Sequence, residues 1–366
     1  MKIIGSVKED LSQDKRISIT PENVKKFKDL NFSILLEKGY GEHLGISDNE
    51  YEDKGADLKK TKNEILKESQ IILKVNSPPE NEIDFINNGS ILIGQFDPLE
   101  RKEVLNKLIK KKVNIFSLNL LPRITRAQSM DVLSSQANLA GYRAVIESVE
   151  EFDKAIPMMM TAAGTITPAR VMVIGAGVAG LQAIATAKRL GAIVCATDVR
   201  RVAKEQVESL GGKFLTVEGL ENLETAGGYA KEAGKDFKKK QAKLIQESVK
   251  KNDIIICTAL IPGKKAPRII TEEMVKSMKS GSIIYDLAVT QGGNSAFSEA
   301  DKIKVVNGVK VMSSKNILNN LALTASSLYS KNLFNFVNNL YSKDKKDIYI
   351  NKEDEIINKT LINKEM

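Results

Sequence analysis

The sequence predicts an α/β fold in which two Rossmann-like domains, each built on a parallel sheet, are joined by long helices. Three observations support this fold. The chain has 366 residues, enough for two domains of about 100–200 residues each. Short apolar runs alternate with helical segments twice along the chain, which is typical of parallel sheets. A glycine-rich motif at 175–180 joins one apolar run to a helix.

The first domain is expected to comprise residues 1–125 and 316–366. A helix should begin after Thr20, because Thr20 is a suitable N-cap and Pro21 fits the first helical position. The segment 316–340 is expected to be helical and to pack back on this domain. The charged tail 342–366 is expected to fray. Its strands are expected at 3–7, 32–37, 71–75, 90–94 and 113–117.

The second domain is expected to comprise residues 126–315 and to begin with one long helix over 126–152. The glycine-rich motif then lies between a strand at 170–175 and a helix at 180–190. Further strands are expected at 192–198, 253–260, 282–289 and 309–312.

The composition excludes several classes of protein. The net charge is +9, but the lysines are scattered and aromatic residues are few, so no nucleic-acid partner is expected. Cys195 and Cys257 lie in apolar runs, which favours buried thiols in a reducing compartment. We find no spacing of metal ligands, so no metal is expected. No apolar run reaches the roughly 20 residues of a membrane span, so the chain is expected to be soluble by itself.

The motif Gly175-Ala176-Gly177-Val178-Ala179-Gly180 fits a dinucleotide site. Gly175 allows the tight turn, Gly177 lets the backbone approach a pyrophosphate, and Gly180 lets helix and strand pack closely. Asp198 follows the next strand, where a carboxylate can accept hydrogen bonds from ribose hydroxyls and repel a 2′-phosphate. NAD(H) is therefore favoured over NADP(H), although Arg200 and Arg201 weaken the preference.

Two further segments could flank the nucleotide. Thr258, Ala259 and Leu260 end a strand in the second half of the sheet, where such strand ends line the crevice. The glycine-rich segment 224–230 has Tyr229 near its tip. It could be a lid that closes over the cofactor or a plain surface loop, and the sequence favours neither.

A polar patch precedes the second domain. Gln128, Asp131 and Ser135 fall on one face of the expected helix, with Ser134 beside them, and Arg123 could pair with Asp131. These groups could grip a carboxamide and its ribose, which would orient a nicotinamide. A solvated first turn with local ion pairs explains the pattern equally well.

Groups that handle protons are scarce. His43 is the chain's single histidine, and its glycine-rich surroundings indicate an exposed loop. Hydride transfer between two nicotinamide rings needs close alignment but no acid–base pair, whereas a dehydrogenase must manage its substrate's proton. The sequence therefore fits hydride relay better than substrate oxidation.

Residues 126–144 resemble the soluble NAD(H)-binding domain I of the alpha subunit of proton-translocating NAD(P) transhydrogenases. The likeness covers most of the chain and continues through 158–164, the glycine motif, 196–200, 204–214, the Tyr229 segment and 258–264.

The resemblance implies a role for each candidate residue. Arg123, Gln128, Asp131 and Ser134 would hold the nicotinamide in the transfer geometry, and Tyr142 would support that face. Val178, Asp198, Val199 and Arg200 would line the adenosine site. Gly228 and Tyr229 would lie on a mobile loop, with Gln241 and Leu260 also near the nucleotide.

The resemblance also implies partners. Domain I of this family forms a homodimer and docks an NADP(H)-binding beta subunit and a membrane subunit that carries protons. The expected reaction takes hydride from NADH to NADP⁺ on the partner, driven by inward proton flow. Since no span is expected here, this chain would be the split-gene form, held on the inner face of the cytoplasmic membrane by its partners.

Alanine dehydrogenase is the alternative, because it is similar to the same family. Its substrate Arg and Lys match Arg16 and Lys74, but Gln95 stands near the expected His and Thr290 at the expected Asp. Both proton-handling positions are therefore changed. Thr290 also departs from the acidic residue expected in transhydrogenases. A non-catalytic NAD(H) sensor or scaffold is a third interpretation, disfavoured because a sensor need not orient the nicotinamide.

Overall fold

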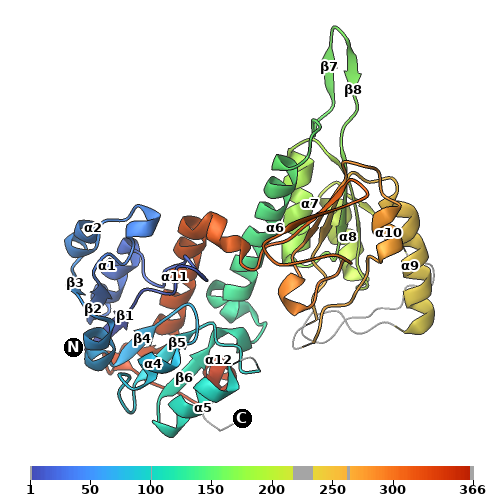
Figure 1. The fold of residues 1–366 in the computed structure, drawn as a ribbon. Coiled ribbons are helices and arrows are strands. Elements are labelled where there is room, and N and C mark those ends of the chain that lie inside the picture. The colour runs from blue at the N-terminus through green and yellow to red at the C-terminus, as the bar shows by residue number, and fades with distance from the viewer. Residues whose placement is uncertain (1, 100, 217–233, 262–263, 363–366) are drawn as a thin grey trace. The chain divides into compact units, whose positions relative to one another are not determined.

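The structure is a computed structural model that describes residues 2–99, 101–216, 234–261 and 264–362 (Figure 1). The chain folds as two compact units. Unit 1 comprises Met1–Gln136 and Leu318–Met366, and unit 2 comprises Ala137–Ile317. The boundary at Gln136 falls within helix α6 (Val132–Glu150).

Unit 1 is built on a seven-stranded sheet in the order β18-β6-β5-β4-β1-β2-β3. All neighbours pair in parallel except β18, which runs antiparallel to β6. The chain order reverses between β1 and β4, which makes that position the topological switch point. The strands are β1 (Lys2–Ser6), β2 (Phe32–Glu37), β3 (Ala56–Lys59), β4 (Ile71–Leu73), β5 (Ile91–Gly94), β6 (Asn114–Ser117) and β18 (Leu361–Ile362).

Helices cover both faces of this sheet, and each face has its own apolar core. Helix α11 returns from the second half of the chain and buries Tyr329, Leu333 and Phe336 in the larger core. The predicted return of this segment to the first half of the chain is what joins 318–366 to unit 1. The helices are α1 (Pro21–Asp29), α2 (Asp48–Asp53), α3 (Lys62–Glu68), α4 (Glu80–Ile83), α5 (Lys102–Lys110), α11 (Ala322–Leu340) and α12 (Glu355–Thr360).

The tail was expected to fray, and that prediction is wrong as far as Ile362. Strands β16 (Tyr341–Ser342) and β17 (Asp347–Ile348) pair with each other, and β18 adds to the sheet edge. Ile356 and Ile357 of α12 are buried. The charged residues of this segment face solvent, whereas its isoleucines recur at positions that complete the core.

Unit 2 also carries a seven-stranded sheet, in the order β11-β10-β9-β12-β13-β15-β14, with only β14 antiparallel. The parallel strands follow the 3-2-1-4-5-6 order of nucleotide-binding Rossmann folds, and the chain order reverses between β9 and β12. The strands are β9 (Arg170–Ile174), β10 (Ile193–Thr197), β11 (Lys213–Phe214), β12 (Ile254–Cys257), β13 (Ile283–Asp286), β14 (Ile303–Val306) and β15 (Val309–Met312). The predicted α/β class with two Rossmann-like sheets is confirmed.

Helices α7 (Val178–Arg189), α8 (Val202–Ser209), α9 (Lys235–Val249) and α10 (Glu272–Lys276) flank this sheet. A hairpin of β7 (Met159–Thr161) and β8 (Gly164–Ile166) projects away from the rest of unit 2 (Figure 1). Short 3₁₀ turns occur at Glu42–Leu44, Leu118–Leu120, Thr125–Met130, Val289–Gln291 and Ile317–Leu321. Among the described residues, no helix is both long and apolar enough to span a membrane.

The expected helix over 126–152 does not begin at Arg126. Residues Thr125–Met130 form a 3₁₀ turn, and α6 starts only at Val132. Asp131 between them is extended, with φ −73° and ψ 92°. Its carboxylate accepts hydrogen bonds from Ser134 N at 2.9 Å and Ser134 Oγ at 2.5 Å. Asp131 therefore caps α6, because a local side-chain acceptor competes with helix continuation.

Candidate nucleotide-binding site

The glycine loop lies at the switch point of unit 2. Strand β9 ends at Ile174, Gly175 takes a φ of +92°, and Gly177 is the N-cap of α7. The left-handed turn at Gly175 reverses the chain directly onto the helix N-terminus, where free N–H groups favour an anion. No side-chain cap occupies that N-terminus.

The three glycines differ in the space around them. A Cβ on Gly180 would meet the carbonyl oxygen of Gly175 at 1.9 Å, and a Cβ on Gly175 would meet Thr258 Oγ1 at 2.8 Å. Among the described residues, a Cβ on Gly177 would find only Arg200 Nη2, at 3.9 Å. Gly175 and Gly180 are thus required by internal packing, whereas Gly177 faces an open surface that a pyrophosphate could approach.

Asp198 follows β10 and is only 8% exposed. Its Oδ2 accepts a hydrogen bond from Ala176 N of the glycine loop at 2.6 Å. Arg200 pairs with the same carboxylate, with Nη2 2.8 Å from Oδ2. The predicted partnership between the glycine loop and this carboxylate is therefore a direct contact in the structure.

The end of β12 forms the other wall of the switch point. Thr258 Oγ1 donates to the carbonyl oxygen of Gly175 at 2.7 Å. Asn294, which is fully buried, accepts from Ala259 N at 3.0 Å and donates to Ala259 O at 2.8 Å. Leu260 is 40% exposed beside them. The sequence reasoning missed Asn294, and its position after a glycine pair was the only signal.

Other candidate residues of unit 2 are distributed around this loop. Gly141 packs against the glycine loop's helix, since a Cβ there would lie 2.0 Å from Ala179 O. Tyr142 follows it on α6 and is 38% exposed. Val178, Val199 and Gln241 are half-buried. Gly228 and Tyr229 lie outside the described residues.

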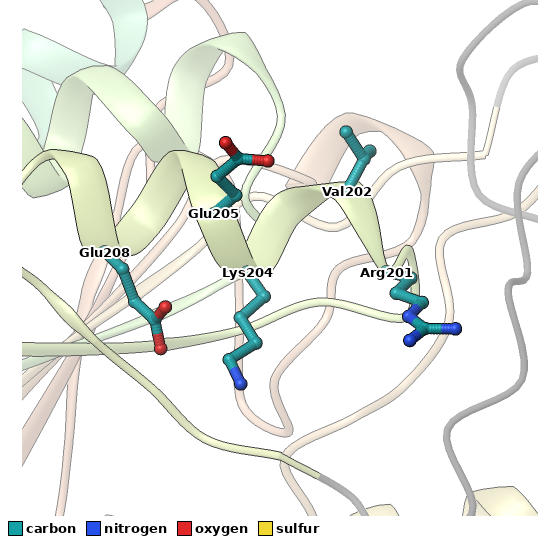
Figure 2. A pocket seen from close by; sticks show the side chains of 5 residues that line it. All are labelled: Arg201, Val202, Lys204, Glu205 and Glu208. Atoms are coloured by element: carbon teal, nitrogen blue, oxygen red, sulfur yellow. The ribbon is translucent and has the colours of Figure 1, made fainter.

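A shallow surface hollow of about 470 Å³ lies along α8 (Figure 2). Its walls are the side chains of Arg201, Val202, Lys204, Glu205 and Glu208. Four of these five are charged, with both signs present, and only Val202 is apolar. The hollow therefore lacks the apolar walls expected around a nucleotide base, and we do not assign it to the cofactor.

The residues expected to hold the nicotinamide belong to the other side of the unit boundary. Arg123 and Gln128 are exposed, and Asp131 and Ser134 are half-buried and bonded to each other. Because Gln128 lies in the 3₁₀ turn, it does not share a helix face with Asp131 and Ser135, as had been expected. The Asp131–Ser134 pair is the part of this set that unit 1 assembles by itself.

The switch point of unit 1 is filled by its own charged groups. Arg16 is bound by Asp14 through Nε (3.0 Å) and Nη2 (2.7 Å), and its Nη1 donates to Gln95 at 3.0 Å. Lys74 is 1% exposed and pairs with Glu82 at 2.9 Å. The chain's own acceptors thus engage both cations.

Neither cysteine has the features of a reactive thiol. Burial raises the pKa of Cys195 and raises that of Cys257 well above its ordinary value. Both are free, as predicted. A raised pKa keeps the thiol protonated, and the protonated form is a poor nucleophile.

Comparison with known proteins identifies the family. The profile described as "Alanine dehydrogenase/PNT, N-terminal domain" matches residues 5–140, and the corresponding C-terminal profile matches 144–365. The chain belongs to the alanine dehydrogenase/PNT family. Membership supports NAD(H) binding at the glycine loop, and the open surface at Gly177 fits such a ligand.

Within this family the chain is more similar to transhydrogenases than to alanine dehydrogenases. It is 49% identical to the first segment of the split NAD(P) transhydrogenase subunit alpha of Rhodospirillum rubrum, over 99% of this chain and 96% of that protein. The crystal structure of a transhydrogenase from Sinorhizobium meliloti covers 98% of each chain, with 45% identity and a TM-score of 0.89. The resemblance to the transhydrogenase alpha subunit is therefore confirmed.

Alanine dehydrogenases are more distant members of the family. That of Methanococcus maripaludis is 28% identical over 80% of this chain and 73% of its own length. A solved L-alanine dehydrogenase covers 98% of this chain and 94% of its own, with 20% identity and a TM-score of 0.80, which shows a shared fold.

Proposed function

We propose that this chain is the NAD(H)-binding subunit of a proton-translocating NAD(P) transhydrogenase. It would hold NADH while hydride passes to NADP⁺ on a partner domain, with proton movement inward through membrane subunits. Relatives named as the first segment of a split alpha subunit match over nearly their whole length, and that name implies further subunits.

The observation that carries the proposal is the open surface at Gly177. A side chain there would meet no described atom closer than 3.9 Å, although its neighbours Gly175 and Gly180 are tightly packed. This gap lies at the α7 N-terminus, where backbone N–H groups would bind the pyrophosphate. Asp198 would then lie near the adenosine ribose and favour NAD(H).

The remaining residues would orient and shield the ligand. Asp131 and Ser134, held together at 2.5 Å, would present a fixed polar pair to the nicotinamide end, with Arg123 and Gln128 on the same segment. When bound, the dinucleotide itself supplies the hydride. The protein needs to provide alignment and exclusion of water rather than an acid or base.

Alanine dehydrogenase activity is disfavoured by the state of Arg16 and Lys74. Both are engaged by Asp14, Gln95 and Glu82 at 2.7–3.0 Å. An amino-acid carboxylate would have to displace these partners, and Gln95 cannot transfer a proton as a histidine does. Thr290 is exposed and likewise has no acidic group.

We also propose that two copies associate through the hairpin β7–β8. An isolated two-stranded ribbon is at best marginally stable, yet this one exposes Met158 (61%), Met160 (83%) and Ile166 (39%). Residues 155–169 carry no charge, which is unusual for solvent-facing chain. A second copy is the occupant we favour, because a self-complementary contact would cover both arms at once.

The location of the complex follows from these proposals. The chain would lie in the cytoplasm and be held on the inner face of the membrane by its membrane and NADP(H)-binding partners.

The decisive experiment mixes this chain with a recombinant NADP(H)-binding domain of a transhydrogenase. NADPH on that domain should reduce acetylpyridine adenine dinucleotide, followed by absorbance, only when both proteins are present. A parallel assay supplies pyruvate, ammonia and NADH to this chain alone. Turnover in that second assay would reject the proposal in favour of an amino-acid dehydrogenase.

A further inference from the structure

The carboxylate of Asp198 is fully occupied by the chain's own donors. Its Oδ1 accepts from Arg200 N at 2.8 Å and Arg200 Nε at 3.0 Å. Its Oδ2 accepts from Ala176 N at 2.6 Å and Arg200 Nη2 at 2.8 Å. Four donors match the roughly four lone-pair directions of a carboxylate. A ribose hydroxyl can therefore donate to Asp198 only by displacing one of them.

The four donors are not equally replaceable. Ala176 N and Arg200 N belong to the backbone of the glycine loop and of the turn after β10, so losing them would distort both segments. The two guanidinium nitrogens sit on a side chain that can rotate. The guanidinium of Arg200 is therefore the group that a ribose would exchange for.

The same guanidinium also lies next to the open surface of the glycine loop. Among the described residues, its Nη2 is the only group within 4 Å of a Cβ built on Gly177, at 3.9 Å. The Arg200 side chain is 13% exposed, so it is reachable from that surface. Its positive charge thus stands where two parts of a dinucleotide would approach.

We propose that Arg200 is a specificity-determining residue that occupies the ribose position of Asp198 and neutralises its charge until a nucleotide binds. This inference rests on the proposed NAD(H) binding. A 2′-phosphate carries about −1.5 to −2 charges at pH 7. It meets a neutral Asp198–Arg200 pair in this chain, rather than a bare carboxylate. Arg200 therefore weakens the discrimination against NADP(H) that Asp198 alone would give.

The test measures the dissociation constants of NADH and NADPH by fluorescence titration for the intact chain and its variants. In Arg200→Gln, the ratio of the NADPH to the NADH dissociation constant should rise at least about tenfold, because an unscreened carboxylate repels the 2′-phosphate. Arg200→Met should give the same rise, and it serves if the glutamine variant fails to fold. The control is Arg189→Gln, the same charge change at the far end of α7, whose ratio should stay within about twofold of the parent.

An unchanged or lower ratio in both Arg200 variants would overturn the inference. A merely structural role predicts that result, since local distortion weakens the two nucleotides alike. If the parent chain binds neither nucleotide, the proposed function itself fails, and the two failures are thus distinguishable.

Discussion

Gly180 packs so closely against Gly175 that a Cβ on Gly180 would lie 1.9 Å from the carbonyl oxygen of Gly175. Gly177, between them in the sequence, has no such neighbour among the described residues. Two substitutions in one loop should therefore fail for different reasons. Gly180→Ala should destabilise the fold by about 1–3 kcal/mol, since the overlap involves backbone that cannot move away freely.

Gly177→Ala should leave the melting temperature nearly unchanged, because the N-cap φ of −78° suits alanine and space is available. Its NADH dissociation constant should rise by about tenfold or more, because the methyl group blocks approach of the pyrophosphate. Thermal melts and NADH titrations of both variants test this division. A Gly177→Ala chain that binds NADH normally would show that the pyrophosphate lies elsewhere.

Gln128→Asn should slow hydride transfer and change NADH binding little. The substitution keeps the amide but shortens its reach by one methylene, so only the alignment of the nicotinamide suffers. Asp198→Ala should instead weaken NADH binding. The measurements are the transfer rate in the two-protein assay and the NADH dissociation constant. Equal losses of binding in the two variants would refute the proposed division of roles.

The comparison of sequence with structure is most favourable where local rules and topology agree. The apolar runs ending at Gly175 and Asp198 predicted the strands β9 and β10 to within a residue or two, because buried parallel strands are nearly continuous apolar segments. The roles of Gly175, Gly177 and Gly180 could likewise be predicted, since each follows from the geometry of one turn.

The errors arose where tertiary contacts decide. Nothing in the spacing of Gln128 and Asp131 reveals that Asp131 turns its carboxylate onto Ser134 and starts a new helix. The tail looked unstructured from its charge, but Ile356 and Ile357 complete a core supplied by distant segments. The saturation of Asp198 was equally hidden, because it depends on the rotamer of Arg200.

The stability of unit 1 should depend on pH through Asp14. Burial would raise the pKa of this carboxyl, but the hydrogen bonds and charge of Arg16 outweigh burial and hold the pKa below its ordinary value of 3.8. Unfolding then takes up a proton, so this contribution is present above about pH 4 and lost as the pH falls through the folded value. Glu9, Tyr329 and Asn76 are the other polar neighbours.

Asp14→Asn should therefore lower the free energy of unfolding at pH 7 by about 3–5 kcal/mol, since it leaves the buried Arg16 without its charged partner. Its stability should also fall less steeply than that of the parent below pH 4. Urea titrations between pH 3 and 7 measure both effects. Glu22→Gln, which breaks an exposed pair with Lys26, is the control and should change stability by less than about 1 kcal/mol.

The C-terminal segment should stabilise unit 1 through its isoleucines rather than through its ion pair. Arg126 bonds both carboxylate oxygens of Asp354 at 2.7 Å, but its side chain is 53% exposed. Arg126→Ala should accordingly cost less than about 1 kcal/mol. Ile356→Ala should cost about 2–5 kcal/mol, because the residue is fully buried. Similar losses in urea titrations of the two variants would contradict this order.

The hairpin β7–β8 gives the prediction for assembly. If two copies bury each other's arms, Met160→Lys should convert a dimer into a monomer in sedimentation equilibrium. Burying one methionine side chain is worth about 1.5–3 kcal/mol, and symmetry counts the loss twice. Leu323→Lys is the matched control, because Leu323 is 53% exposed on α11 of unit 1, and this variant should remain dimeric. A dimer that survives Met160→Lys would place the interface on another surface, and a monomeric parent chain would reject the dimer altogether.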